Sequence, residues 1–408
     1  MTLRDDALKL HLENHGKLAV VSKVPIKTRE DLALAYTPGV AEPCKDIKEN
    51  KDLSFEYTCR GNMVAIVSDG TRVLGLGDIG PEAAMPVMEG KAALFKTFGD
   101  VDAVPICIDT KDPAKIIETV RFLQPSFAGI NLEDISSPKC YDIECELKKI
   151  CDIPVFHDDQ HGTAIACLAA VIGALRFVKK DMKTAKFVVN GCGAAGSAIG
   201  RLLISMGAEN VTMVDRFGAL YEGIDANLDR IQSYLATVTN KEHKKGTLAD
   251  IAKGADVLIA VSAPNVFTKE IIASMADKAI VFALANPVPE TSYADAIEAG
   301  AAVAGTGRSD SPNQVNNVTV FPGVFRGAID VRAKAITEEM KVAAVYAISE
   351  LIDEKDLRAD YVVPDAFDPR VAPAVAAAVA RVAMETGIAR IKVDPEEVRA
   401  NTMKRVGR

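Results

Sequence analysis

The residues best placed to do chemistry lie in the stretch PVFHDDQHGTAIA, residues 154–166, where two histidines flank two aspartates. Histidines four residues apart on a helix could bind zinc, as in the motif H-E-x-x-H. The proline that opens the stretch favours a strand there, and Gly162 would cost roughly 1 kcal/mol inside a helix. We therefore expect His157, Asp158 and Asp159 to lie where a strand ends and a helix begins, which disfavours the zinc motif.

A second pair of acids, Glu133 and Asp134, follows the apolar run FAGIN as the aspartates at 158 and 159 follow PVF. If both runs are strands of one parallel sheet, these carboxylates lie along the same edge. Gathered carboxylates repel one another unless a cation sits among them, and oxygen ligands suit Mg²⁺ or Mn²⁺ better than zinc. Asp78 is a further acid in this part of the chain. The residues indicate a divalent-metal site, and solvated loop acids are the alternative.

The segment GCGAAG matches the G-x-G-x-x-G motif of dinucleotide-binding proteins. A buried strand precedes it and a helix follows it, so the glycines would let backbone N–H groups approach a pyrophosphate at the helix N-terminus. A tight strand–helix turn without a ligand is the alternative. The residues that we assign to cofactor binding here are Gly191, Gly193, Ala194, Ala195 and Gly196.

The next strand, NVTMV, ends at Asp215, where an acid is placed for the ribose hydroxyls of the adenosine. A carboxylate repels a 2′-phosphate by about 4 kcal/mol at about 4 Å and an effective dielectric constant of about 20. The adjacent Arg216 would partly reverse that preference by pairing with the phosphate. We therefore predict NAD as the cofactor, with NADP as the alternative.

Strand-like and helical runs alternate along the chain, which favours an α/β fold with mainly parallel sheets. The strand-like runs are MVAIV, VLGLG, AVPICI, FAGINL and PVF, then KFVV, NVTMV, DVLIAVS, KAIVFALA and AAVAG. Helices are expected at 85–97, 113–123, 141–150 and 197–206. From residue 322 the chain reads as helical, and this tail should pack back on the first domain. The predicted domains are an N-terminal α/β substrate and metal domain (1–160), a Rossmann-type NAD(P)-binding domain (161–325) and C-terminal helices (326–408).

Composition narrows the classes of function. The chain has 408 residues, 49% hydrophobic and 25% charged, with a net charge of -8. The acidic balance argues against a nucleic-acid surface, and the absence of a run of eighteen apolar residues argues against a membrane span. The charged start lacks the apolar core of a signal peptide, so we expect a cytoplasmic protein. The eight cysteines should be reduced thiols, and the cluster at 140, 145 and 151 does not have zinc-site spacing.

Seven segments occur in an order that matches a known family. They are YTPGVA from Tyr36, RVLGLGDIG from Arg72, EGK ending at Lys91, NLED ending at Asp134, FHDDQHGTA from Phe156, ANP around Asn286 and NNV around Asn317. In this order they resemble the segments of malic enzymes, in the compact bacterial and archaeal form. The match runs from about residue 36 to residue 321, and the helical tail also fits. The phosphotransacetylase-like domain of some bacterial relatives is not in this sequence.

The resemblance implies oxidative decarboxylation of L-malate to pyruvate and CO₂ with NAD(P)⁺ and Mn²⁺ or Mg²⁺. It assigns the metal to Glu133, Asp134 and Asp159, and the general base to Lys91 with Asp158 beside it. Tyr36 would be the general acid and Arg72 would hold a substrate carboxylate. Asn286 and Asn317 would lie where the substrate meets the nicotinamide. Neither histidine of the opening stretch is implied as a ligand. A lysine base requires a lowered pKa, which we expect from burial and a neighbouring cation.

Three other functions deserve comparison. A malolactic enzyme would convert malate to lactate with retained NAD, and net NADH release separates the two. A non-catalytic NAD-binding regulator would lack the base, the acid or the acid pairs, and all are present here. An amino-acid dehydrogenase has a similar plan but no role for the paired acids. The resemblance also implies a homodimer, and whether Tyr36 serves its own subunit or a neighbour stays open.

Overall fold

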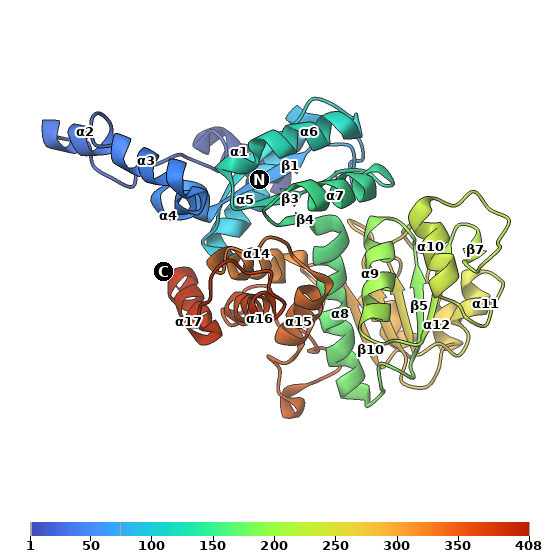
Figure 1. Ribbon diagram of the computed structural model, residues 1–408. Coiled ribbons are helices and arrows are strands. Elements are labelled where there is room, and N and C mark those ends of the chain that lie inside the picture. The colour runs from blue at the N-terminus through green and yellow to red at the C-terminus, as the bar shows by residue number, and fades with distance from the viewer. Residues whose placement is uncertain (1, 74, 408) are drawn as a thin grey trace.

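The computed structural model describes residues 2–73 and 75–407 and contains two sheets on either side of one long helix, α8 (Asp158–Val178) (Figure 1). The first sheet has four parallel strands in the order β2-β1-β3-β4. They are β1 (Met63–Ser68), β2 (Asp102–Cys107), β3 (Gly129–Leu132) and β4 (Val155–His157). Three helices pack with this sheet: α5 (Pro81–Gly99), α6 (Pro113–Leu123) and α7 (Lys139–Ile150).

The second sheet has the order β10-β9-β8-β5-β6-β7 and is parallel except for the short β7. Its strands are β5 (Lys186–Asn190), β6 (Asn210–Asp215), β7 (Gly218–Ala219), β8 (Val257–Ala260), β9 (Ile280–Ala283) and β10 (Val303–Thr306). The helices between them are α9 (Ala194–Ser205), α10 (Arg230–Val238), α11 (Leu248–Ala252), α12 (Lys269–Ala273) and α13 (Tyr293–Glu298). The strand order reverses at β5, which is the arrangement of a Rossmann-type domain. The predicted α/β fold is thus confirmed.

The C-terminal helices return to the first sheet. They are α14 (Phe321–Asp330), α15 (Glu338–Ser349), α16 (Val371–Glu385) and α17 (Pro395–Val406). Phe95 of α5 packs on Phe321 and Phe325 of α14, with ring centroids 4.6 and 5.3 Å apart. Buried aromatic pairs at this distance contribute beyond their burial alone. The prediction that the tail packs on the first domain is confirmed.

The N-terminal residues form an arm that projects from the body, most clearly at α2 and α3 (Figure 1). Its helices are α1 (Leu3–Asn14), α2 (Arg29–Ala35), α3 (Ala41–Glu49) and α4 (Ser54–Tyr57), and two 3₁₀ turns, at 51–53 and 59–62, follow α3 and α4. None of the described residues of α1 to α4 is buried. The arm therefore exposes apolar side chains that the body of the same chain does not cover.

Two local predictions were wrong. The run VLGLG, residues 73–77, was expected to be a strand; it includes residue 74, which lies outside the described residues. Val73 and Gly77 form an isolated bridge, and Gly75 and Gly77 have φ of 75° and 78°, which is turn geometry. The second error concerns Gly162, which lies inside α8. The predicted domain limits stay a prediction, and helices α8 and α14 run through both boundaries.

Helix α8 is long and apolar enough, by length and composition, to cross a membrane, which the sequence argument overlooked. Of its most apolar window, 83% is buried inside the described part of the protein. The surrounding elements already cover it. It is the central core helix of the fold.

Candidate active site

The acid cluster lies at the C-terminal edge of the first sheet. Strands β3 and β4 are parallel neighbours with Leu132 paired to His157, so the residues that follow each strand meet at one edge. One ligand atom from each of Glu133, Asp134 and Asp159 lies within 4.8 Å of the others. The backbone N–H of Asp134 donates to Asp159 Oδ2 at 2.9 Å, which ties the two strand ends together. The structure thus brings together the three acids that were predicted to bind metal.

The electrostatics of this cluster fit a cation. Burial raises the pKa of Glu133 well above its usual range, although Lys91 opposes the shift. Burial and the charge of Asp159 raise the pKa of Asp134 to about 7. The buried Oδ2 of Asp134 has no hydrogen-bond partner among the described residues. An oxygen-ligated divalent ion would both neutralise the cluster and satisfy that oxygen.

Lys91 lies on α5 beside these acids. Its Nζ lies 3.0 Å from Glu133 Oε1, forms a second ion pair with Asp158, and lies 4.1 Å from the centre of the Phe321 ring. Burial lowers the pKa of Lys91, but Asp158 and Glu133 outweigh burial and raise the pKa above its usual value. These anionic neighbours favour the ammonium form, so the expected lowering of the pKa depends on a neighbouring cation as well as on burial and stays a prediction.

Asp158 and Asn317 explain why a glycine lies inside α8. Asn317, on the 3₁₀ turn Asn317–Thr319, donates to Asp158 Oδ2 through its side-chain amide. A Cβ on Gly162 would lie 1.9 Å from Asp158 Oδ1 and 3.2 Å from Asn317 Cβ. The helix accepts the cost of glycine because this contact admits no side chain. Asp158 therefore joins Lys91 to the turn that precedes α14.

A buried polar network, which was not predicted from the sequence, lies beneath the acids. His157 Nε2 lies 3.2 Å from Asp159 Oδ2, although it is not aligned for a hydrogen bond. Gln160 Nε2 lies 2.9 Å from His157 Nδ1 and 3.2 Å from Glu144 Oε2, and Arg201 of α9 donates to Gln160 Oε1 at 3.0 Å. A guanidinium only donates hydrogen bonds and a carboxylate only accepts them. The Oε1 of Gln160 therefore faces Arg201, and its Nε2 faces Glu144. The network links the first sheet to the helix of the glycine motif.

His161 belongs to the same network rather than to a metal site. Its Nε2 lies 2.8 Å from Glu144 Oε1, and its Nδ1 lies 3.2 Å from Lys341 Nζ. Burial lowers the pKa of Lys341 to about 8. No motif of the sequence singles out Glu144, Arg201 or Lys341. Gln160 lies within the segment FHDDQHGTA, but no role was predicted for it.

Tyr36 and Asp78 lie apart from the cluster, and Arg72 lies beside it with an exposed side chain. Tyr36 caps the C-terminus of α2 on the projecting arm and is 66% exposed. The side chain of Arg72 is exposed, while its backbone N–H donates to Asp134 O at 3.0 Å. Asp78 is half-exposed and pairs with Lys111 at 2.6 Å, so it does not join the other acids.

The glycine motif lies between β5 and α9. Gly193 precedes α9, and Ala194 and Ala195 are its first residues. Gly191 has φ of 103°, and a Cβ on Gly196 would lie 1.8 Å from Gly191 O, so neither position admits a larger residue without a shift. This geometry leaves the backbone N–H groups of the helix start open to a phosphate.

Asp215 and Asn286, which are predicted to contact the two ends of the dinucleotide, lie at the ends of strands of the second sheet. Asp215 is the last residue of β6; its Oδ1 accepts from Arg216 N at 2.7 Å and its Oδ2 from Gln232 Nε2 at 2.8 Å. Asn286 follows β9, is partly buried, and has its amide nitrogen 3.5 Å from Leu284 O. Both side chains lie on the carboxyl edge of the sheet, where such folds bind nucleotides.

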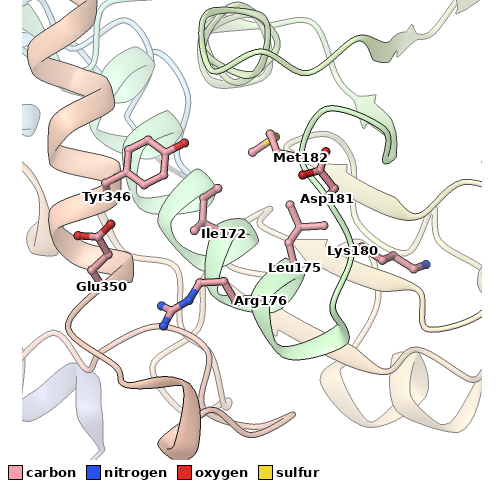
Figure 2. A pocket seen from close by; sticks show the side chains of 8 residues that line it. All are labelled: Ile172, Leu175, Arg176, Lys180, Asp181, Met182, Tyr346 and Glu350. Carbon is pink, nitrogen blue, oxygen red and sulfur yellow. The ribbon is translucent and has the colours of Figure 1, made fainter.

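A separate cavity of about 390 Å³ lies at the far end of α8 (Figure 2). Its lining from α8 is about 20 Å from the acids, given a rise of 1.5 Å per residue from Asp159 to Ile172. The cations that line it are already paired: Arg176 donates to Ser349 O at 2.7 Å, and Lys180 pairs with Asp256 at 2.7 Å. The cavity is therefore distinct from the acid cluster.

Comparison with known proteins agrees with this geometry. The family model described as malic enzyme, N-terminal domain matches residues 15–148, and that described as malic enzyme, NAD binding domain matches residues 160–384. A bifunctional malic/malolactic enzyme of Bacillus subtilis is 58% identical over 99% of this chain and 98% of its own length. An NAD-dependent malic enzyme of Geobacillus stearothermophilus is 51% identical over 92% of this chain and 78% of its own length.

A solved structure of a malic enzyme from Pyrococcus horikoshii has a TM-score of 0.96 to this chain, with 46% identity. The alignment covers 100% of this chain and 96% of that one. Both family models match in the order in which the two sheets occur, and the acid cluster and the glycine motif fall on the expected strand ends. The chain therefore belongs to the malic enzyme family.

Proposed function

We propose that this malic enzyme, which decarboxylates malate oxidatively with NAD(P)⁺, uses Lys91 as general base and Tyr36 as general acid. Glu133, Asp134 and Asp159 would hold Mn²⁺ or Mg²⁺. The observation that carries the proposal is the position of Lys91 Nζ, 3.0 Å from Glu133 and paired with Asp158 at the edge of the acid cluster. A buried ammonium beside a cation site is placed to exchange a proton with a bound hydroxy acid.

Each residue has a separate task in this scheme. A divalent ion held by the acids would offset their charge and lower the pKa of Lys91, so that its neutral amine could take the C2 hydroxyl proton as hydride leaves for the nicotinamide. Asp158 would orient the ammonium that results. Arg72 pairs with a malate carboxylate. When bound, the divalent ion supplies charge stabilisation to the oxygen of the keto acid during loss of CO₂. Tyr36 then protonates the enolate carbon, which yields pyruvate.

The direct test is NADH absorbance with malate and Mn²⁺, with NAD or NADP supplied separately. NADH production that EDTA abolishes supports the scheme, and metal-independent production contradicts it. A second reaction merits measurement because the Bacillus subtilis relative is named a bifunctional malic/malolactic enzyme. Lactate formed from malate without net NADH release would establish the malolactic activity for this chain as well.

We also propose that the enzyme is a homodimer in which the arm of one subunit brings Tyr36 to the site of the other. The arm exposes apolar side chains that a monomer would leave in water, among them Val20 at 104% and Leu34 at 78% exposed. Exposed apolar patches of this kind mark protein–protein contacts. Tyr36 caps α2 and Lys91 belongs to α5. Within one chain, α2 lies on the projecting arm, apart from α5 (Figure 1).

Subunit mixing tests the placement of Tyr36. Tyr36→Phe and Lys91→Ala homodimers should each be nearly inactive. If Tyr36 acts on the neighbouring site, dissociating and reassociating a mixture should restore activity, because each hybrid contains one site with both native residues. Turnover of malate before and after mixing is the measurement. Mixtures that gain activity only when native protein is added would place Tyr36 in its own subunit's site.

We propose NAD as the preferred cofactor, because Asp215 ends β6 where the adenosine ribose binds in such folds. Asp215→Ser should shift the ratio of kcat/KM for NADP over NAD upward by about tenfold or more, since about 1.4 kcal/mol corresponds to one decade. The shift arises because the carboxylate no longer repels a 2′-phosphate. An unchanged ratio would show that Asp215 does not face the ribose.

We retain a cytoplasmic location as a proposal. All eight cysteines are free thiols in the structure, including the exposed Cys44 and Cys59. Free thiols are the usual state in reducing compartments. Fractionation of cells that produce the protein is the corresponding measurement.

A further inference from the structure

We propose that Glu290 is a positioning residue for the nicotinamide half of the dinucleotide site. Its carboxylate holds together the two loops that follow β8 and β9. Oε1 accepts from Ser262 N at 2.6 Å and from Ser262 Oγ at 3.1 Å, and Oε2 accepts from Ala285 N at 2.9 Å. Glu290 is fully buried.

The carboxylate is held by these donors alone. Among the described residues, no lysine, arginine or histidine lies within 4.0 Å of it, unlike the carboxylates of the acid cluster, which face Lys91 and His157. A buried charge without a counter-ion requires well-made hydrogen bonds, and two of the three donors are backbone N–H groups. The arrangement fixes the backbone of both loops rather than a side chain.

The topology assigns these loops to the nicotinamide. The strand order reverses at β5, and a dinucleotide crosses the sheet at that point. Asp215, proposed to face the adenosine ribose, follows β6 on one side of β5. Ser262 and Ala285 follow β8 and β9 on the other side, so they underlie the opposite end of the cofactor. Ala285 directly precedes Asn286, which we propose to face the nicotinamide, and to that extent the inference rests on the proposed function.

Contacts of both loops support this placement. Ser262 Oγ accepts from Asn190 Nδ2 at 2.9 Å, and a Cβ on Gly191 would lie 3.2 Å from Ser262 Cβ. The loop after β8 thus abuts the first glycine of the phosphate-binding motif. The loop after β9 reaches the first domain, since a Cβ on Gly75 would lie 3.2 Å from Pro287 Cδ. Glu290 thus joins the loops that follow two neighbouring strands of the second sheet.

Glu290→Gln tests the role with little change in shape. An amide has one accepting oxygen, so its NH₂ group faces the N–H of either Ser262 or Ala285, and one loop loses its hydrogen bond to this side chain. The backbone bonds from Asn265 N to Pro289 O and from Phe267 N to Glu290 O remain. We expect the Kd of NADH to rise about tenfold, the lower end of the effect of one charge-assisted hydrogen bond. The Kd of ADP-ribose, which lacks the nicotinamide, should change less than about twofold. Calorimetry with EDTA present, and without malate, measures both.

Control variants distinguish an effect on the two loops from a general destabilisation of the domain. Glu298→Gln makes the same change at an exposed ion pair of the same domain, 2.8 Å from Lys269, and should leave both Kd values unchanged. If Glu290→Gln does not fold, Glu290→Asp replaces it, because it keeps the charge but is too short to reach both loops. The Kd of NADH should again rise about tenfold, and the Kd of ADP-ribose should again change less than about twofold. Equal losses for NADH and ADP-ribose, or no loss for either, would overturn the proposal. Because the assay omits metal and malate, it stands even if the roles of Lys91 or Tyr36 are wrong.

Discussion

Lys91→Ala is expected to lower malate turnover by at least about 100-fold, because general-base catalysis usually contributes 10² to 10⁴. The variant also leaves Glu133 and Asp158 buried without their common cation, so its thermal unfolding has to be measured beside its activity. Lys91→Arg separates the two effects. Its guanidinium keeps the positive charge but does not release a proton near neutral pH, so it should be as inactive as the alanine variant.

Lys96→Ala is the matched control for this experiment. Lys96 lies on the same helix, is exposed, and pairs with Asp100 and Asp102 at 2.6 and 2.8 Å on the surface. Its loss should leave turnover within about twofold of the parent, since exposed ion pairs contribute little. A loss of under about tenfold in Lys91→Arg would contradict the role of Lys91 as the base.

Asp159→Ala is expected to abolish metal-dependent turnover while the Kd of NADH changes little. The variant removes a proposed oxygen ligand and also the acceptor for Asp134 N, so the two strand ends lose one hydrogen bond at the cluster. Mn²⁺ binding followed by electron paramagnetic resonance gives the affinity for the ion directly. NADH fluorescence gives the cofactor affinity, and the chain has no tryptophan to interfere.

Asp78→Ala is the control for the acid cluster. Sequence grouped Asp78 with the other acids, but it pairs with Lys111 at 2.6 Å on the surface. Its removal should leave Mn²⁺ affinity unchanged.

If NADH affinity falls in parallel with metal affinity in Asp159→Ala, the two sites are not separable and the assignment of Asp159 to metal alone is wrong.

Local patterns in the sequence predicted the parts of the site that follow directly from strand ends. The acids at 133 and 134 come straight after β3, and those at 158 and 159 after β4, so parallel pairing was enough to bring them together. Asp215 was placed at the end of β6 in the same way. Residues that directly follow parallel strands lie at the carboxyl edge of the sheet. The hydrophobic pattern and the order of the strands are therefore enough to predict that such residues lie close together.

Features that depend on long-range contacts could not be predicted in this way. Glu290 holds Ser262 across 28 positions, and nothing in the local pattern marks it as more than a loop acid. Gly162 was read as a helix breaker because the approach of Asp158 and Asn317 is a tertiary contact. The direction of the pKa shift at Lys91 depends on how many carboxylates surround the amine and on the cation that they would hold. Each of these features depends on residues that are far apart in the sequence, so a local sequence pattern does not predict it.

The return of α14 to α17 onto α5 has a consequence for synthesis on the ribosome. The second sheet, from β5 to β10, is continuous in sequence, although its inner face shares one core with α8 and with the C-terminal helices. The first sheet is translated earlier, but Phe95 and Phe156 wait for Phe325 of α14 to complete their core. Until then the nascent chain exposes this apolar face of α5 to chaperones. The domain that is synthesised first therefore completes its core only when the last helices of the chain are available.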